Sequence, residues 1–346
     1  MAIQELIARM PKAELHLHLD GSSRPSTIIE LARQQGVQLP SEDEAELSAI
    51  LMPGENCQSL EDYLKAFDIT CSVMGTKDAL YRIAYELVED CARDQHRYME
   101  VRWATRVLPQ TMSPREMVEA VWAGLRDAGE KYQVVARQIL CGMRHEDPQH
   151  GIDTATLAAQ CKDLGVVAYD IAGAEAPFPP SVHVESFRIA QNANLRTTCH
   201  AGEAGGADFV REAIVLAGSE RIGHGTRLEQ DPELQQYVVD REIPIEVCLT
   251  SNVQTKATAA FSTHPLRRYL NAGAKVVLCT DNRTVSGVSL QDEFERAHQH
   301  HGVSVDELRT LTFNAFDSAF LPRSERIALR DQALRDFDAI RGELGL

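Results

Sequence analysis

The stretch PKAELHLHLDG, residues 11–21, contains the first regular pattern of the sequence. From Glu14 to Asp20 it alternates polar with apolar side chains. In an extended strand successive side chains point to opposite faces, so His16 and His18 lie on one face and the leucines on the other. Two imidazoles on one face could bind a single metal ion, but the same alternation also occurs at the polar edge of a sheet. The segment therefore predicts a strand and leaves the question of a metal site open.

Short apolar runs of this kind recur along the chain, and segments with helical periodicity separate them. The predicted strands are 14–19, 98–104, 136–142, 166–172, 195–201, 221–225, 243–249 and 275–280. Strands that alternate with helices form a parallel sheet. Over 346 residues this pattern predicts an α/β fold, a closed (β/α)₈ TIM barrel. A doubly wound open sheet is disfavoured, because no Gly-x-Gly-x-x-Gly turn follows the first strand.

The span 20–97 is too long for a simple crossover between the first two strands. We predict that it contains extra helices after strand 1, which cover part of the barrel mouth. Within 59–67, apolar side chains recur with the spacing of one helix face: Leu60, Tyr63, Leu64 and Phe67. Such a face can belong to the hydrophobic core, or it can form an apolar lid over a substrate.

Composition and charge narrow the class of protein. The chain has 51 acidic and 35 basic residues, a formal charge of −16, which argues against a nucleic-acid partner. No signal peptide or membrane span is predicted. The eight cysteines are scattered without Cys-x-x-Cys pairs, which indicates reduced and mostly buried thiols. We therefore expect a single cytoplasmic domain, residues 1–346, without a membrane partner, and we predict no particular oligomeric state.

Polar side chains gather at the carboxyl ends of the predicted strands, where barrel enzymes build their active sites. Each residue alone has a structural explanation: a lone buried histidine is often just hydrogen-bonded, and a carboxylate can cap a helix. Their recurrence at one end of the barrel favours a functional site. The residues concerned are His16, His18, Asp20, Gly173, His200, Glu203, His224, Asp281 and Asn282.

Part of this set has the composition of a metal site. The candidate ligands are His16, His18, His200 and Asp281. Nitrogen and oxygen ligands without a thiolate suit catalytic zinc, or iron or manganese, and such an ion can lower the pKa of a bound water to about 7. Glu203, three residues after His200, could transfer a proton, and His224 could orient or deprotonate the water. No lysine ends the fourth strand, so one metal is expected rather than two.

The motifs resemble one known family. HLHLDG, CHAGE, RIGHGTRL, SNVQT and TDN occur in the order found in the adenosine deaminase family of the metal-dependent amidohydrolase superfamily. SLEDYLKAFD, MEVRWATRVLP, CGMRH and DIAGAE are also similar to family segments. The resemblance extends from about Pro11 to Phe316, which is nearly the whole chain. His-x-His alone is a weak signal, whereas this combination is specific.

The resemblance implies hydrolytic deamination of adenosine and 2′-deoxyadenosine to inosine and 2′-deoxyinosine, with release of ammonia. One zinc ion per chain would be held by the four candidate ligands, and zinc-activated water would attack C6 of the purine. By the same resemblance Glu203 protonates N1, and His224 positions the water and acts as base. The partner is then a small purine nucleoside.

The resemblance also assigns residues to substrate binding. Gly173 would offer its backbone N–H to purine N3, a close approach that suits a residue without a side chain. Asp20 would hold a sugar hydroxyl. The apolar face of Leu60, Tyr63 and Phe67 would then be the lid.

Two positions depart from the family pattern. Asn282 stands where many members have a second aspartate that contacts purine N7. N7 is an acceptor, and the Asn282 amide can donate to it without the protonation that a carboxyl would need. Lys256 stands in SNVQTKA where a small residue is common. It could favour an anionic substrate extension if it faced the mouth, and it is otherwise a surface lysine.

Other functions remain as alternatives. Adenine deaminases resemble HLEG where this chain has HLDG, so Asp20 favours a nucleoside over the free base. A modified nucleoside such as aminodeoxyfutalosine is the nearest enzymatic alternative. A nucleotide is disfavoured because no glycine-rich phosphate loop or dense basic cluster occurs. A non-catalytic metal-binding interaction protein is disfavoured because all ligands, Glu203 and His224 are present.

Overall fold

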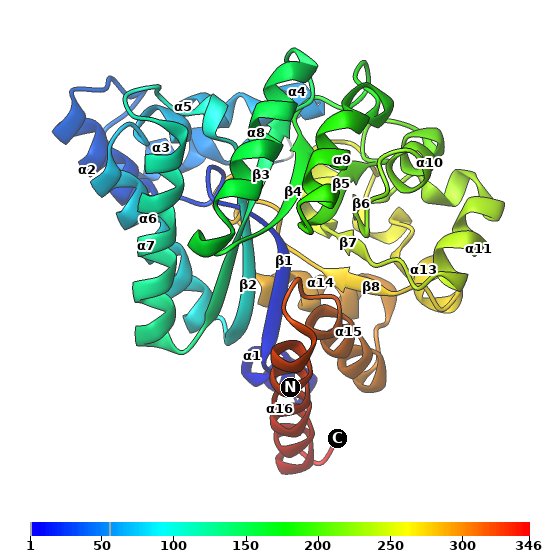
Figure 1. Cartoon of the computed structure of the whole chain (residues 1–346). Helices are drawn as coiled ribbons and strands as arrows, with labels where there is room; N and C mark the ends of the chain where they lie inside the picture. The colour runs from blue at the N-terminus through cyan, green and yellow to red at the C-terminus, as the bar shows by residue number, and fades with distance from the viewer. Residues whose placement is uncertain (1, 55–56) are drawn as a thin grey trace.

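The structure, a computed structural model, describes residues 2–54 and 57–346 and contains one eight-stranded sheet. Each strand pairs in parallel with the next one along the chain. The strands are β1 (Lys12–His18), β2 (His96–Trp103), β3 (Val135–Met143), β4 (Val166–Ala172), β5 (Arg196–Ala201), β6 (Arg221–His224), β7 (Ile245–Val247) and β8 (Val276–Leu278). The predicted parallel sheet is confirmed, and Figure 1 shows its helices packed around the strands.

The sheet closes into a barrel where the segment after β8 meets β1. Leu17 forms a parallel bridge with Asp281. The backbone N–H of His18 donates to the Asp281 carbonyl at 2.7 Å, and the Asp281 N–H donates to the His16 carbonyl at 3.0 Å. The (β/α)₈ barrel predicted from the sequence is therefore confirmed, and its closing seam brings the first strand to the last.

Helices follow the strands around the outside of the barrel. They include α6 (Lys77–Arg93), α7 (Pro114–Tyr132), α8 (Pro148–Gln160), α9 (Val184–Asn192), α10 (Ala207–Val215), α11 (Pro232–Asp240), α12 (Leu249–Gln254), α13 (Leu266–Asn271), α14 (Leu290–His301) and α15 (Val305–Asp317). The start of α7 illustrates the local signals: Ser113 and Glu116 form a capping box, and Pro114 occupies the first turn. A side chain at Gly124 of α7 would lie 2.3 Å from the Tyr81 carbonyl, so glycine permits the close packing of α6 on α7.

The long span after β1 holds the extra helices that the sequence predicted. They are α2 (Pro25–Gln35), α3 (Glu44–Leu51), α4 (Leu60–Leu64) and α5 (Ala66–Ser72), and they lie near the upper end of the barrel in Figure 1. The apolar stretch 59–67 is not one helix, because the chain breaks between α4 and α5 at Lys65. Its apolar side chains nevertheless face one cavity: Leu60, Tyr63, Leu64 and Phe67.

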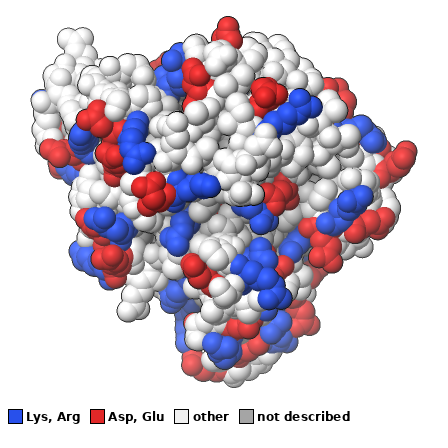
Figure 2. Space-filling view, viewed as in Figure 1, with Lys and Arg blue, Asp and Glu red and all other residues white. Residues whose placement is uncertain are grey.

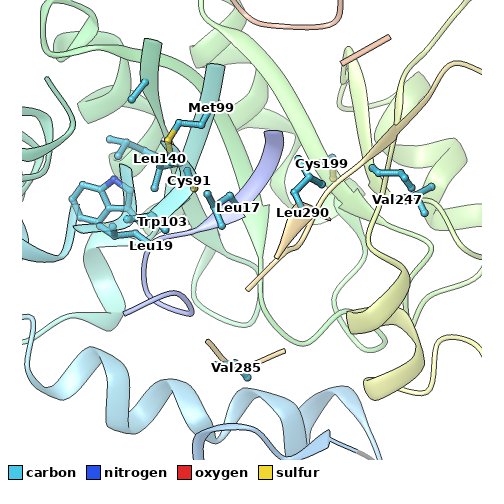
Figure 3. Close-up of a cluster of buried hydrophobic side chains, with 14 of the residues drawn as sticks. Leu17, Leu19, Cys91, Met99, Trp103, Leu140, Cys199, Val247, Val285 and Leu290 are labelled. Carbon is cyan, nitrogen blue, oxygen red and sulfur yellow. The ribbon is translucent and has the colours of Figure 1, made fainter. Parts of the chain in front are cut away.

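The hydrophobic core lies between the strands and the surrounding helices. Leu17 and Leu19 turn away from the barrel axis and belong to the same cluster as Trp103 and Leu140 (Figure 3). All eight cysteines are buried and unpaired, as the sequence predicted. Within the described ranges, no helix combines the length and the apolar character needed to cross a bilayer.

The terminal helices lie at the other end of the barrel. Helix α1 (Ala2–Arg9) contacts α16 (Arg323–Glu343), and an ion pair joins Arg9 to Glu343. Figure 1 shows both termini below the strands, away from α4 and α5. On the face shown in Figure 2, acidic and basic side chains are interspersed, so this face carries both signs of charge.

Candidate active site and metal centre

A cavity of about 710 Å³ opens at the carboxyl ends of the strands, beneath α4 and α5. The predicted residues that line it are His18, Asp20, Leu60, Tyr63, Phe67, Gly173, His200, Glu203, His224, Asp281 and Asn282. His16 is fully buried at the edge of this group. The structure thus brings together the side chains that the sequence placed at the strand ends.

The four predicted metal ligands converge on one point. The Nε2 atoms of His16 and His18 lie 3.3 and 3.4 Å from Asp281 Oδ1, and the Nε2 atoms of His18 and His200 are 3.2 Å apart. Four tetrahedral ligands at zinc bond lengths are about 3.3 Å from one another. His16 Nε2 has no hydrogen-bond partner among the described residues. The spacing and the unpaired nitrogen both fit a bound metal ion.

His224 also belongs to this cluster. Its ligand atom and those of His16, His200 and Asp281 all lie within 4.8 Å of one another. Both His224 (φ 63°) and Asp281 (φ 64°) adopt the left-handed backbone region, which is unusual for residues with a side chain. Such strain is common at functional sites, and here it occurs where β6 and β8 end. Gly223 makes room for the cluster, because a Cβ there would lie 3.0 Å from His16 Cε1.

Two buried carboxylates stand behind the histidines, and the sequence did not predict either of them. His16 Nδ1 is 2.9 Å from Glu246 Oε2, and His200 Nδ1 is 2.9 Å from Asp170 Oδ2. Arg102 donates to both carboxylates, at 2.7 Å to Asp170 and 2.8 Å to Glu246. Carboxylates in this position orient metal-binding histidines. The only available signal was a charged residue inside an apolar strand.

Burial and charge set the protonation of the cluster. Burial lowers the pKa of both His16 and His200, which favours the neutral imidazoles that bind metals. Burial alone would raise the pKa of Asp281, but the adjacent His16 ring and the other nearby histidines hold it well below its usual range. Ser251 donates to Asp281 Oδ2 at 2.6 Å and leaves Oδ1 facing the histidines.

Glu203 is a buried acid at the floor of the cavity. Burial raises its pKa. Thr255 donates to its Oε1 at 2.9 Å, while Oε2 lies 3.6 Å from His224 Nε2. A buried carboxyl with a raised pKa can carry a proton near neutral pH, which is what a general acid requires.

A second carboxylate, Glu175, shapes the loop that carries Glu203. It accepts hydrogen bonds from the successive backbone N–H groups of residues 202–205, at distances between 2.6 and 2.9 Å. The loop therefore cannot move without breaking these bonds. Glu175 lies in the DIAGAE motif, but no role for it was predicted; the carboxylate following a family glycine was the missed signal.

His224 is held from the side away from the cavity. Its Nδ1 lies 3.0 Å from Asn252 Nδ2, and Asn252 Oδ1 lies 3.1 Å from His264 Nε2. Neither Asn252 nor His264 was predicted to take part in the site. Asn252 belongs to the SNVQT motif, whereas nothing near His264 in the sequence links it to His224.

The substrate side of the cavity offers unsatisfied polar atoms. Asp20 Oδ1 and Asn282 Oδ1 are buried and have no hydrogen-bond partner within the described part of the chain. Gly173 has φ 98°, a conformation that disfavours a side chain, and a Cβ there would lie 3.1 Å from Met143 Cε. Lys256 is exposed and is not among the described residues that line the cavity.

The lid is tied to the barrel by a polar contact. The hydroxyls of Tyr63 and Ser286 are 2.7 Å apart, which joins α4 to the segment after β8. Phe67 packs near Tyr63, with ring centroids 6.2 Å apart. The predicted apolar face therefore both packs internally and lines the cavity.

Comparisons with known proteins agree with this geometry. The family model for adenosine deaminase matches residues 11–335. An adenosine deaminase from Clostridium acetobutylicum is 37% identical over 330 residues, which cover 95% of this chain and 98% of the relative.

Solved structures share the fold over nearly the full length. An amidohydrolase from Burkholderia ambifaria with bound Zn has a TM-score of 0.91 and 26% identity, and the match covers 99% of this chain and 95% of that one. An N6-methyl-AMP deaminase from Arabidopsis thaliana has a TM-score of 0.83 and 30% identity, with 98% and 99% covered. Together with the converging histidines and the buried acid, these matches show that the chain belongs to the adenosine deaminase family of metal-dependent amidohydrolases.

Proposed function

We propose that this chain deaminates adenosine and 2′-deoxyadenosine to inosine and 2′-deoxyinosine, with release of ammonia. One observation carries the proposal: a cluster spaced for a metal and a buried acid with a raised pKa meet at the floor of a single cavity. Its volume, about 710 Å³, lies within the range typical of small-molecule sites. The adenosine deaminases among its relatives support the same reaction.

The residues present fit one zinc ion per chain, held by His16, His18, His200 and Asp281. The support is the spacing of 3.2 to 3.4 Å between donor atoms, the unpaired Nε2 of His16 and the zinc in a related amidohydrolase. When bound, such an ion supplies Lewis-acid activation of water near neutral pH.

Glu203 and His224 are the proposed catalytic residues. Protonated Glu203 donates its proton to purine N1 while the oxygen of water bonds to C6. The proton on N1 neutralises the negative charge that this addition would otherwise leave on the ring. His224, with Nε2 3.6 Å from Glu203 Oε2, holds the water by a hydrogen bond. The proton lost by the water is transferred to N6, the C6–N6 bond breaks, and N6 leaves as ammonia.

The remaining residues orient the nucleoside. In this proposal the Gly173 N–H donates to N3, the Asn282 amide donates to N7, and Asp20 accepts from a sugar hydroxyl. Leu60, Tyr63 and Phe67 cover the base. The unpaired oxygen of Asp20 supports this arrangement, because buried polar atoms left unpaired are rare unless a ligand completes them.

The charge of the cavity favours a nucleoside over a nucleotide. Among the described residues that line it, none is lysine or arginine, while Glu61 and Asp68 contribute acidic groups. A 5′-phosphate would therefore lack a cationic partner, although one structural relative is an N6-methyl-AMP deaminase. Adenine and a modified nucleoside such as aminodeoxyfutalosine remain the alternative substrates.

We also infer a cytoplasmic location and a single domain over residues 1–346. The first inference is supported by the eight buried, unpaired cysteines, which suit a reducing compartment. The second is supported by the barrel seam between Leu17 and Asp281.

A substrate panel tests the proposal. The zinc-loaded protein is given adenosine, 2′-deoxyadenosine, adenine, AMP and aminodeoxyfutalosine, and ultraviolet absorbance and ammonia release are followed. We expect the highest kcat/KM with the two unmodified nucleosides. Turnover of none of these compounds would refute the deaminase, and a preference for another member would reassign its substrate.

The variant Glu203→Gln tests the acid in the same assay. We expect kcat to fall roughly 10²- to 10⁴-fold while zinc content stays at the wild-type level, because Gln keeps the shape and loses the transferable proton. Near-normal turnover by this variant would remove Glu203 from the mechanism.

A further inference from the structure

A line of buried side chains runs from His224 away from the cavity. His224, Asn252 and His264 are 1%, 0% and 4% exposed. The line joins His224 Nδ1 to Asn252 Nδ2 at 3.0 Å, and Asn252 Oδ1 to His264 Nε2 at 3.1 Å. Neither Asn252 nor His264 is among the described residues that line the cavity, and their side chains are linked to it through His224.

The far end of the line fixes the direction of its hydrogen bonds. The backbone N–H of Leu266 donates to His264 Nδ1 at 3.1 Å. A backbone N–H can only donate, so this Nδ1 is an acceptor and carries no proton. Burial lowers the pKa of His264 to about 3, so the ring is neutral and its one proton lies on Nε2.

This proton orients the Asn252 amide. His264 Nε2–H must meet the carbonyl oxygen of Asn252, since the amide NH₂ cannot accept a hydrogen bond. The NH₂ group is thereby turned toward His224, where it donates to Nδ1. An imidazole ring that accepts at Nδ1 carries its proton on Nε2, the nitrogen 3.6 Å from Glu203 Oε2.

We propose that Asn252 and His264 are positioning residues that hold His224 in the Nε2–H tautomer, so that His224 donates a hydrogen bond to the attacking water and does not accept its proton. The base role that the family resemblance implied for His224 then passes to Glu203. The kinetic consequence rests on the proposed deaminase function, whereas the tautomer itself does not.

Glu203 alone can donate and accept every proton that the reaction transfers. Glu203 gives its proton to N1, and as the C6–O bond forms the proton lost by water passes to the Glu203 carboxylate. Glu203 next protonates N6, and the C6–N6 bond breaks to release ammonia. The C6 hydroxyl returns its proton to Glu203 as the carbonyl forms, so the enzyme ends in its starting state.

Nitrogen NMR of the zinc-loaded protein with ¹⁵N-labelled histidine tests the tautomer directly. We expect the His224 Nδ1 signal at the shift of an unprotonated ring nitrogen and the Nε2 signal at that of a protonated one. Signals are assigned with single histidine substitutions. A proton on His224 Nδ1 in the wild-type protein would overturn the proposal.

Two near-isosteric variants test the positioning. In Asn252→Asp the carboxylate can only accept, so we expect a proton on His224 Nδ1 and a loss in kcat of roughly 10²- to 10⁴-fold, with KM little changed. Asn314→Asp is the matched control, because Asn314 is also buried and its amide donates to the Val276 carbonyl at 3.0 Å, outside the site. We expect it to keep the tautomer of His224 and a kcat close to that of the wild type.

The outcomes separate the two proposals. An unchanged His224 tautomer in Asn252→Asp overturns the positioning role, whatever the rate. The expected tautomers in a protein that deaminates no member of the substrate panel would refute the proposed function and leave the tautomer assignment standing. A changed tautomer with an unchanged kcat would show that His224 is not required as a donor, and would overturn its proposed part in the reaction.

Discussion

Among the described residues, two buried groups of potential metal ligands each include a residue of β1, but only one group has the character of an active site. At the carboxyl ends of the strands are His16, His200, His224 and Asp281; near the start of β1 and β2 are Glu14, Cys91 and His96. Each group brings its ligand atoms within 4.8 Å of one another and is buried. Residue type and proximity therefore do not distinguish them.

Their hydrogen-bond partners and their position relative to the cavity distinguish the two groups. Glu14 already accepts from the Thr280 backbone at 2.7 Å and the Thr280 hydroxyl at 2.5 Å, and His96 Nε2 lies 2.9 Å from its other oxygen. Lys12 and Arg283 lie 3.6 and 3.1 Å from the adjacent Asp94 and add positive charge. At the other end the carboxylates sit behind the histidines and leave ring nitrogens facing the cavity. His96 Nδ1 is also buried without a hydrogen-bond partner among the described residues, but none of Glu14, Cys91 and His96 lines that cavity. The two groups therefore differ in that only the first places free donors at a cavity.

Replacing one histidine from each group tests this contrast most severely. We expect His16→Ala to lose stoichiometric zinc. Removing a ligand should weaken metal binding by more than the roughly 10- to 100-fold typical of replacing a residue that only hydrogen-bonds to a ligand. His96→Ala should keep its zinc and its kcat, and lose about 1 to 3 kcal/mol of stability because Glu14 loses a partner. Elemental analysis measures the zinc content of each variant, and urea unfolding measures its stability. Stoichiometric zinc in His16→Ala would refute its ligand role.

The carboxylates behind the histidines give a smaller effect. Asp170→Asn keeps Oδ1, which accepts from the Ile171 and His200 backbones, and places an NH₂ group against Arg102 and His200 Nδ1. We expect zinc affinity to fall roughly 10- to 100-fold in chelator competition. Glu100→Gln is the control, because this carboxylate pairs with Arg221 and touches no predicted ligand. Equal losses in both variants would count against a specific orienting role.

The smallest effect is expected at the start of β1, where a cation is buried. Burial lowers the pKa of Lys12 to about 8 from its ordinary value of 10.5. Between these two values the unfolded chain binds more protons than the folded one, so the free energy of unfolding rises with pH, by at most about 1.4 kcal/mol per pH unit. We expect Lys12→Met to lose this rise. Urea unfolding of both proteins at pH 8 and pH 10 measures it, and parallel curves would contradict the assignment.

Much of this architecture was predictable because it depends on local patterns. Alternation in β1 and the polar residues at the strand ends predict the barrel, and they predict that the four candidate ligands and Glu203 lie together at one end of it. The partners of those residues come from across the barrel, and the sequence has no local pattern that pairs His16 with Glu246 or His200 with Asp170. For the same reason His264, which contacts Asn252 from a separate element, was missed.

Other differences have a conformational cause. The last two strands end earlier than predicted: β7 ends at Val247, just before α12 begins at Leu249, and β8 ends at Leu278, three residues before the left-handed Asp281. The break at Lys65 is likewise invisible to apolar periodicity, since the residues on either side still face one cavity.

The seam between β1 and β8 also bears on how the protein is made. His16 and His18 are synthesised before Asp281, which follows the other seven strands in the sequence. The predicted ligand set is therefore complete only once Asp281 has been made, and a metal ion held by it would bind after that point. Because metal binding contributes to folding free energy, such an ion would stabilise the contact between β1 and the segment after β8.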